Sequence, residues 1–221
     1  MSAILDKALA NRRAKPFQQF GQGNDYTTRN GANGCTHATL QFLAWLWKKR
    51  WYTQDQVSRM AGYPGWPTVN RGLYPGEVRR FIAAAGLPYK VVNGLDFYLL
   101  ERATTKGPVL VAHSYAWVPE WQGYTYYGRT ADGKPNGYAR PFGRAGKTQL
   151  SGWAGAHMGV LLGKNGASRY FWEPNHNTGA RPENPPYDVI NHDQMIRLYG
   201  SYKSTLGRSL YAVIPTRSLS T

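Results

Sequence analysis

The chain has 221 residues, of which 42% are hydrophobic, and it carries 27 Lys and Arg against 12 Asp and Glu, a formal charge of +15. This length suits one domain with its own core, because domains of ~150–250 residues bury roughly 70% of their unfolded surface. The single cysteine, Cys35, excludes an intramolecular disulfide and a cysteine-based zinc cluster. It is therefore either an inert buried thiol or a nucleophile.

The first half of the domain is predicted to be helical. Residues 1–33 are polar and basic, and we interpret them as an N-terminal arm after a short first helix, followed by a single domain over 34–221. Residues 36–50 have apolar side chains at helical spacing and cations in the last turn, where they suit the helix dipole. These features predict a helix.

Two shorter helices are predicted next. Thr53 is a suitable N-cap for a helix that ends at Gly62. The third helix follows Pro75 and ends at Gly86. Its inward side chains are predicted to be Val78, Phe81, Ile82 and Ala85.

The second half of the domain is predicted to be mainly sheet. LPYKVVNG and GPVLVAHSY are short, Val-rich runs bounded by Gly and Pro, which is typical of strands. AHMGVLLG and ASRYFWEP are predicted to form a hairpin around Asn165-Gly166, a pair that adopts the positive φ angles of tight turns. A short helix over 193–199 and a strand over 209–215 complete the order, so the expected fold class is α+β.

A long loop is predicted over 119–154, where Gly, Tyr, Lys and Arg recur and aliphatic residues are scarce. Loops of this length in a compact domain are usually functional or serve in docking. Trp153, Tyr124 and Tyr127 are candidates to pack against the sugar rings of a substrate, or else to fill space beneath the loop.

Cys35 lies between a Gly/Asn-rich loop and the first turn of the predicted helix over 36–50. A thiol at a helix N-terminus is close to free N–H groups and the positive end of the dipole, which lower its pKa. Gly34 and Thr36 beside it are not typical of a core. These observations favour a nucleophile over an inert thiol.

A cysteine nucleophile needs a base, and the base needs an orienting group. His157 begins a predicted strand directly after the long loop. If Gly163 pairs with Ala167 in the hairpin, counting back brings Glu173 opposite His157, and opposed Cβ atoms are ~5 Å apart. We therefore predict that His157 is held by Glu173, or by Asn175 just beyond it.

The order of these features over roughly residues 18–175 resembles the papain-like cysteine peptidases, especially the branch of bacteriocin-processing, double-glycine-leader peptidases and their phage and bacterial relatives. The resemblance implies a papain-like fold with N-terminal helices and an antiparallel sheet, and no metal or cofactor. It implies that Cys35 is the nucleophile and His157 the base. Glu173, followed by Pro174, takes the place of the family's Asp-Pro carboxylate.

The same family has a glutamine several residues before the cysteine as an oxyanion donor. The stretch before Cys35 offers Asn30 and Asn33, with Gln22 further upstream. The backbone N–H of Cys35 is the second predicted donor, and one such donor is worth ~3 kcal/mol of transition-state stabilisation.

The function implied is a thiol-dependent peptidase or amidase that cleaves peptide bonds, and the positive charge favours the anionic bacterial cell wall, with peptidoglycan as substrate. An alternative is a structural phage virion protein, in the tail or associated with the capsid, with a degenerate peptidase fold. Its supports are the polar arm and the long loop, which would be buried against virion proteins. Nucleic-acid binding is a third hypothesis that rests on charge alone.

No apolar run approaches the ~20 residues that cross a bilayer, and the polar start of the chain does not resemble the apolar core of a signal peptide. We therefore expect no membrane span, and any export would use another route. The sequence does not fix a localisation.

Overall fold

The computed structural model describes residues 3–14, 34–63, 72–114, 156–172, 174 and 188–220. The helices in this part of the chain are α1 (Ala3–Ala14), α2 (Cys35–Lys48), α3 (Gln54–Met60), α4 (Pro75–Ala84), α5 (Phe97–Ala103) and α6 (His192–Leu206). The strands are β1 (Tyr89–Asn93), β2 (Val109–Ser114), β3 (Ala156–Asn165), β4 (Ser168–Trp172), β5 (Asp188–Ile190) and β6 (Tyr211–Pro215). The predicted α+β class, with helices before an antiparallel sheet, is confirmed.

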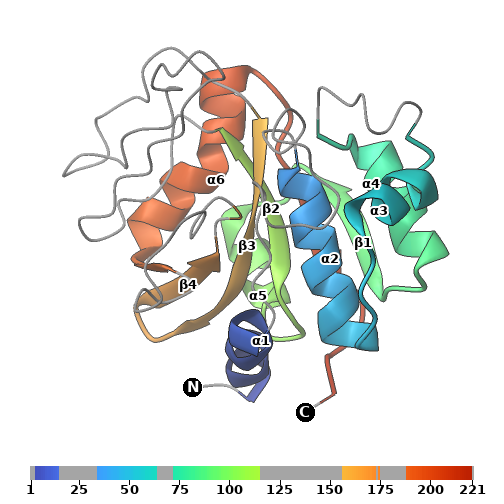
Figure 1. Cartoon of the computed structure of the whole chain (residues 1–221). Helices are drawn as coiled ribbons and strands as arrows, with labels where there is room; N and C mark the ends of the chain where they lie inside the picture. Colours follow the sequence, from blue (N-terminus) through green and yellow to red (C-terminus); the bar gives the residue numbers. More distant parts are fainter. Residues whose placement is uncertain are drawn as a thin grey trace, which may run out of the picture.

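The strands form one sheet in the order β1-β6-β2-β3-β4-β5, with every neighbouring pair antiparallel. Figure 1 shows α2, α3 and α4 on one side of this sheet and α6 on the other. Side chains of successive strand residues point to opposite faces, so the sheet has two cores. The larger contains Phe42, Phe81 and Trp172, and the smaller contains Phe171 and Leu198 beneath α6.

Local sequence signals account for the helices α2 to α4. α2 is apolar on nearly all sides and is buried over most of its length, since it packs between the sheet and α3. Thr53 caps α3 in a reciprocal capping box with Gln56. The four inward residues predicted for α4 are all buried, and both predicted stop glycines, Gly62 and Gly86, have positive φ.

The structure extends the sequence prediction at three elements. α5, with Asp96 as its N-cap, and β5 were not predicted, and α6 continues to Leu206, beyond the predicted end at residue 199. The first part of the predicted arm over 1–33 packs onto the domain, because α1 contacts β3 and its Leu5 is buried in the larger core. The division between arm and domain remains a prediction.

The predicted hairpin register between β3 and β4 is wrong. Asn165 pairs with Ser168, so the two-residue turn is Gly166-Ala167, with Gly166 at a φ of 55°. A glycine at the first central position of a tight turn supplies the positive φ that other residues avoid. A register shift between Leu161 and Gly163 then offsets the strands once more. The count that brought Glu173 opposite His157 is thereby overturned.

The position of Gly159 in β3 has no room for a larger side chain, because the ring of Phe171 packs against it. A Cβ on Gly159 would lie 2.2 Å from Cζ of Phe171 and 2.9 Å from its Cε2. We expect Gly159→Ala to lower the free energy of unfolding by about 1–3 kcal/mol, since the ring is buried and cannot yield without repacking. Urea denaturation measures the change.

Gly200 in α6 is the matched control for this prediction. A Cβ there meets no atom within 4 Å, so Gly200→Ala is expected to stabilise the chain by about 0.5–1 kcal/mol. Combining Phe171→Leu with Gly159→Ala should recover part of the free energy of unfolding that Gly159→Ala loses. Equal stability of the two glycine variants would contradict the steric account.

Candidate active site

Cys35 is the first residue of α2, and Gly34 is its N-cap. Gly34 supplies no side-chain cap and the first turn holds no acidic residue, so no side chain of that turn offsets the positive end of the dipole. The first helical bond runs from the N–H of Ala38 to the carbonyl of Gly34 at 2.9 Å, and the preceding N–H groups have no acceptor within the helix. This end of α2 suits a thiolate or an oxyanion.

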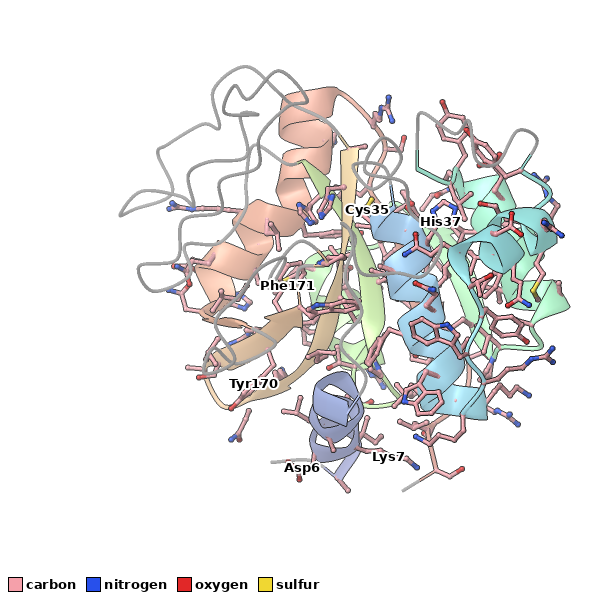
Figure 2. All side chains as sticks on the ribbon, viewed as in Figure 1. Asp6, Lys7, Cys35, His37, Tyr170 and Phe171 are labelled. Atoms are coloured by element: carbon pink, nitrogen blue, oxygen red, sulfur yellow. The ribbon has the colours of Figure 1, made fainter. Side chains whose placement is uncertain are left out.

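Cys35 is 5% exposed and belongs to the larger core. Its Sγ lies 3.7 Å from Oγ1 of Thr36, a weak polar contact between neighbours. Met158, directly after His157 in β3, belongs to the same cluster of buried residues. Figure 2 places Cys35 at the upper end of α2, on the side of β3 that faces the helices.

His157 is the second residue of β3 and pairs directly with His113 in β2. The two rings meet edge to face with centroids 5.0 Å apart, and His113 also meets Phe171 at 5.8 Å. The exposed fraction is 3% for His157 and zero for His113. Sequence reasoning missed His113, although its only local signal, a histidine near the end of GPVLVAHSY, is visible in the sequence.

The two predicted catalytic residues approach the same end of the domain from different faces of the sheet. α2 packs against β3, and both begin at the upper end of the view in Figure 1. Met158 faces α2, so the alternation of the strand directs the ring of His157 toward the face that carries Phe171. The pairing of the thiol with this ring therefore stays a prediction.

His37 on α2 is closer to Cys35 in sequence but is engaged elsewhere. Its Nε2 lies 2.8 Å from Oγ of Ser58 on α3, and the ring is fully buried. Burial lowers the pKa of His37 to about 4, although the Glu77 carboxylate acts in the opposite sense. His37 is thus a neutral residue that joins α2 to α3, and it is a poor general base at neutral pH.

The other predicted site residues lie outside the described residues. They are the orienting candidates Glu173 and Asn175, the oxyanion candidates Gln22, Asn30 and Asn33, and the substrate candidates Trp153, Tyr124 and Tyr127. The predicted loop over 119–154 also lies outside them. Their roles remain predictions.

Two kinds of feature are absent from the residues that the structure describes. No group of three or more His, Cys, Asp or Glu side chains among them is arranged to hold a metal ion. In that same part of the chain, no helix has both the length and the apolar composition needed to cross a bilayer.

Comparison with known proteins identifies the fold. No family model matches the chain, and no curated protein matches it. A crystal structure of a candidate C39-like peptidase from Bacillus anthracis matches over 93% of this chain and 96% of that chain, with a TM-score of 0.53 and 13% identity. The chain therefore has the fold of a C39-like peptidase, a papain-like fold, as the sequence resemblance implied.

Proposed function

We propose that the chain is a thiol-dependent peptidase or amidase that hydrolyses peptide bonds in the bacterial cell wall. The observation that carries this proposal is the place of Cys35 as the first residue of the 14-residue helix α2, in a fold shared with a C39-like peptidase. The position of Cys35 at a helix start and the shared fold together favour a nucleophilic thiol, although neither feature alone would establish one. The likeness in fold supports a peptide as the class of substrate, and the charge of +15 supports the anionic cell wall as the place where the chain acts.

In the proposed reaction, the thiolate of Cys35 attacks the carbonyl carbon of an amide and a C–S bond forms. The oxyanion accepts hydrogen bonds from the N–H of Cys35 and from Asn30, Asn33 or Gln22. His157 gives a proton to the departing amine as the C–N bond breaks, and the product is a thioester. Water, deprotonated by His157, then releases the acid and restores the thiol.

Glu173 and Asn175 are both proposed as the group that orients His157. The described register pairs Val160 with Trp172, and counting on from that pair leads from His157 to position 175. The count therefore supports Asn175, whereas the sequence resemblance supports Glu173. Substituting each separately distinguishes them, since only the orienting residue should change the pH dependence of hydrolysis.

The rate at which iodoacetamide alkylates Cys35 tests whether the thiol is activated. We expect a midpoint below ~8.5, the value of a free thiol, because α2 and a protonated His157 both favour the thiolate. His157→Gln should move the midpoint upward. His113→Gln is the matched control, since it removes the opposed ring and should leave the midpoint in place. A midpoint at or above the free value in the parent chain would contradict activation.

The structural virion hypothesis is the second candidate, and the burial of Cys35 favours it. A thiol that is 5% exposed is also the usual state of an inert cysteine in a core. Under this hypothesis the chain assembles into a phage particle and hydrolyses nothing. Tight incorporation into particles, combined with an unactivated thiol, is the result that would support it.

A further inference from the structure

Six cations gather at the end of the molecule opposite to Cys35, and we call them the basic patch. They are Lys7, Lys48, Lys49, Arg50, Lys106 and Arg217. All are exposed except Lys7, which is half-buried. Figure 2 shows Lys7 on α1 at the lower end of the view and Cys35 at the upper end of α2. Since α2 spans 14 residues, at ~1.5 Å per residue the two ends are roughly 20 Å apart.

Contacts between separate segments hold the basic patch together. Nζ of Lys7 donates a hydrogen bond to the carbonyl of Ser220, and the N–H of Leu219 donates to the carbonyl of Lys106 at 2.7 Å. Lys49 adopts a left-handed conformation at the end of α2, with φ of 53°. Partial burial, and next the charge of Lys7, lower the pKa of Lys49, so the two cations are close enough to repel each other.

Tryptophan rings fix two of these cations in place. Nζ of Lys49 lies 5.7 Å from the ring centroid of Trp45, and Cζ of Arg217 lies 5.8 Å from that of Trp47. Trp47 is itself anchored, because its Nε1 donates to the hydroxyl of Tyr89 at 3.0 Å. Cations ordered in this way lose less side-chain entropy when they bind an anion.

The same stacking indicates which kind of anion the patch accepts. A cation of the chain lies over one face of each of these two rings, so that face is not open for stacking with bases or sugars. The large apolar side chains that are exposed in the described residues belong to other segments of the chain than the six cations; they are Tyr74, Tyr98, Leu99, Val189 and Ile196. With no exposed apolar anchor in the patch, insertion into a membrane surface is disfavoured. Repeated phosphates along a flexible chain match spaced Lys and Arg groups.

We propose that the basic patch binds the glycerol-phosphate polymer of a cell wall through its phosphates, at a site separate from Cys35. This polymer repeats phosphates along a flexible chain without bases, whereas a nucleic acid also presents bases that would stack on open rings. The contacts are to phosphates alone, so binding falls steeply with salt.

The test is binding to a fluorescent 20-base-pair DNA and, in a second arm, to purified poly(glycerol phosphate), each measured against salt concentration. The patch variant carries Lys48→Gln, Lys49→Gln, Arg50→Gln and Arg217→Gln. We expect its affinity for poly(glycerol phosphate) to fall at least ~100-fold at low salt, and the log–log salt slope to become less negative by roughly 3.

The matched control removes four exposed cations from α4, α6 and the residues after α6. It carries Arg79→Gln, Arg197→Gln, Lys203→Gln and Arg208→Gln. We expect its affinity to stay within ~3-fold of the parent chain, because diffuse charge contributes less than contacted phosphates. Equal losses in the two variants would overturn the proposal, since binding would then follow net charge alone.

Further outcomes are decisive. Binding of poly(glycerol phosphate) that is lost in the patch variant supports the proposal. Binding only to phosphatidylglycerol vesicles overturns it, and so does tighter binding to DNA or to polyglutamate than to poly(glycerol phosphate), or no binding to that polymer. If the fourfold patch variant does not fold, Lys48→Gln with Lys106→Gln serves instead, since neither side chain stacks on a described ring. Cys35→Ala should bind as the parent chain does, which separates this site from the proposed hydrolysis.

Discussion

The Cys35→Ala variant is expected to lose hydrolysis of cell walls and of a wall stem peptide by at least ~10⁴-fold. Removing the nucleophile of a covalent mechanism eliminates the acyl-enzyme route, and what remains is the small acceleration from binding and the oxyanion donors. The rate of amine release from purified walls, per mole of protein, measures the loss. The expected cost in stability is roughly 1 kcal/mol, because only one sulfur atom is removed from the core.

Two controls make this result specific. Cys35→Ser keeps the shape of the side chain and should be almost as inactive, since a hydroxyl is a far weaker nucleophile at neutral pH. Ser58→Ala removes the hydrogen bond to His37 and should lower stability while leaving the rate per folded molecule unchanged. Full activity of Cys35→Ala would refute the mechanism. Inactivity of the parent chain, with no polymer or peptide cleaved, would favour the structural virion hypothesis.

The sequence predicts the helical half of the fold well because its signals are local. The capping pair of Thr53 and Gln56 lies within one turn, and Gly86 ends α4 only two residues beyond Ala84. α5 has the same kind of signal in Asp96, whose side chain accepts from the N–H of Leu99. It was missed because seven residues are too few to show a helical repeat.

The sheet could be predicted only in part, because strand pairing depends on residues far apart in the chain. The run GPVLVAHSY identifies β2, yet nothing within it indicates that His113 faces His157. The register of β3 against β4 depends on which glycine occupies the turn, and on an irregularity between Leu161 and Gly163 that no local pattern marks. For the candidate site, the sequence therefore misjudged how the strands β3 and β4 align, and the roles of the site residues stay predictions.

Glu101 was not identified from the sequence at all, although it forms the main buried ion pair among the described residues. Its Oε1 accepts from Nε of Arg169 at 2.5 Å, and its Oε2 accepts from Nζ of Lys164 at 3.2 Å. Nη2 of Arg169 lies 3.0 Å from Nδ1 of His192, at the start of α6. The carboxylate of Glu101 thereby joins α5 to β3 and β4, and through Arg169 to α6.

We expect Glu101→Gln to lower the free energy of unfolding by about 3–5 kcal/mol at pH 7. The substitution leaves the guanidinium of Arg169, whose side chain is 8% exposed, buried without its countercharge. Asp55→Asn is the matched control, because it breaks an ion pair with Arg59, whose side chain is 77% exposed. A surface pair of this kind is worth about 0.3–0.5 kcal/mol. Urea denaturation of the three proteins gives both values.

The pH dependence of the same difference provides an independent check. Burial would raise the pKa of Glu101, but hydrogen bonds from Arg169 and Lys164 outweigh it, and the net pKa in the folded chain is lowered from 4.5. The stabilisation is therefore fully present above the unfolded value of 4.5 and is lost as the pH falls through the lower folded value. We expect the gap between the parent chain and Glu101→Gln to be constant above about pH 5.5 and to narrow in stronger acid.

Protonation of His37 does not obscure this result. Its pKa is lowered to about 4 in the folded chain from 6.5, so both proteins lose stability as the pH falls below 6.5. That loss is common to the parent chain and the variant, and it cancels in their difference. A gap that stayed constant from pH 7 down to pH 3, or that matched the small effect of Asp55→Asn, would show that Glu101 does not act as a buried charge partner.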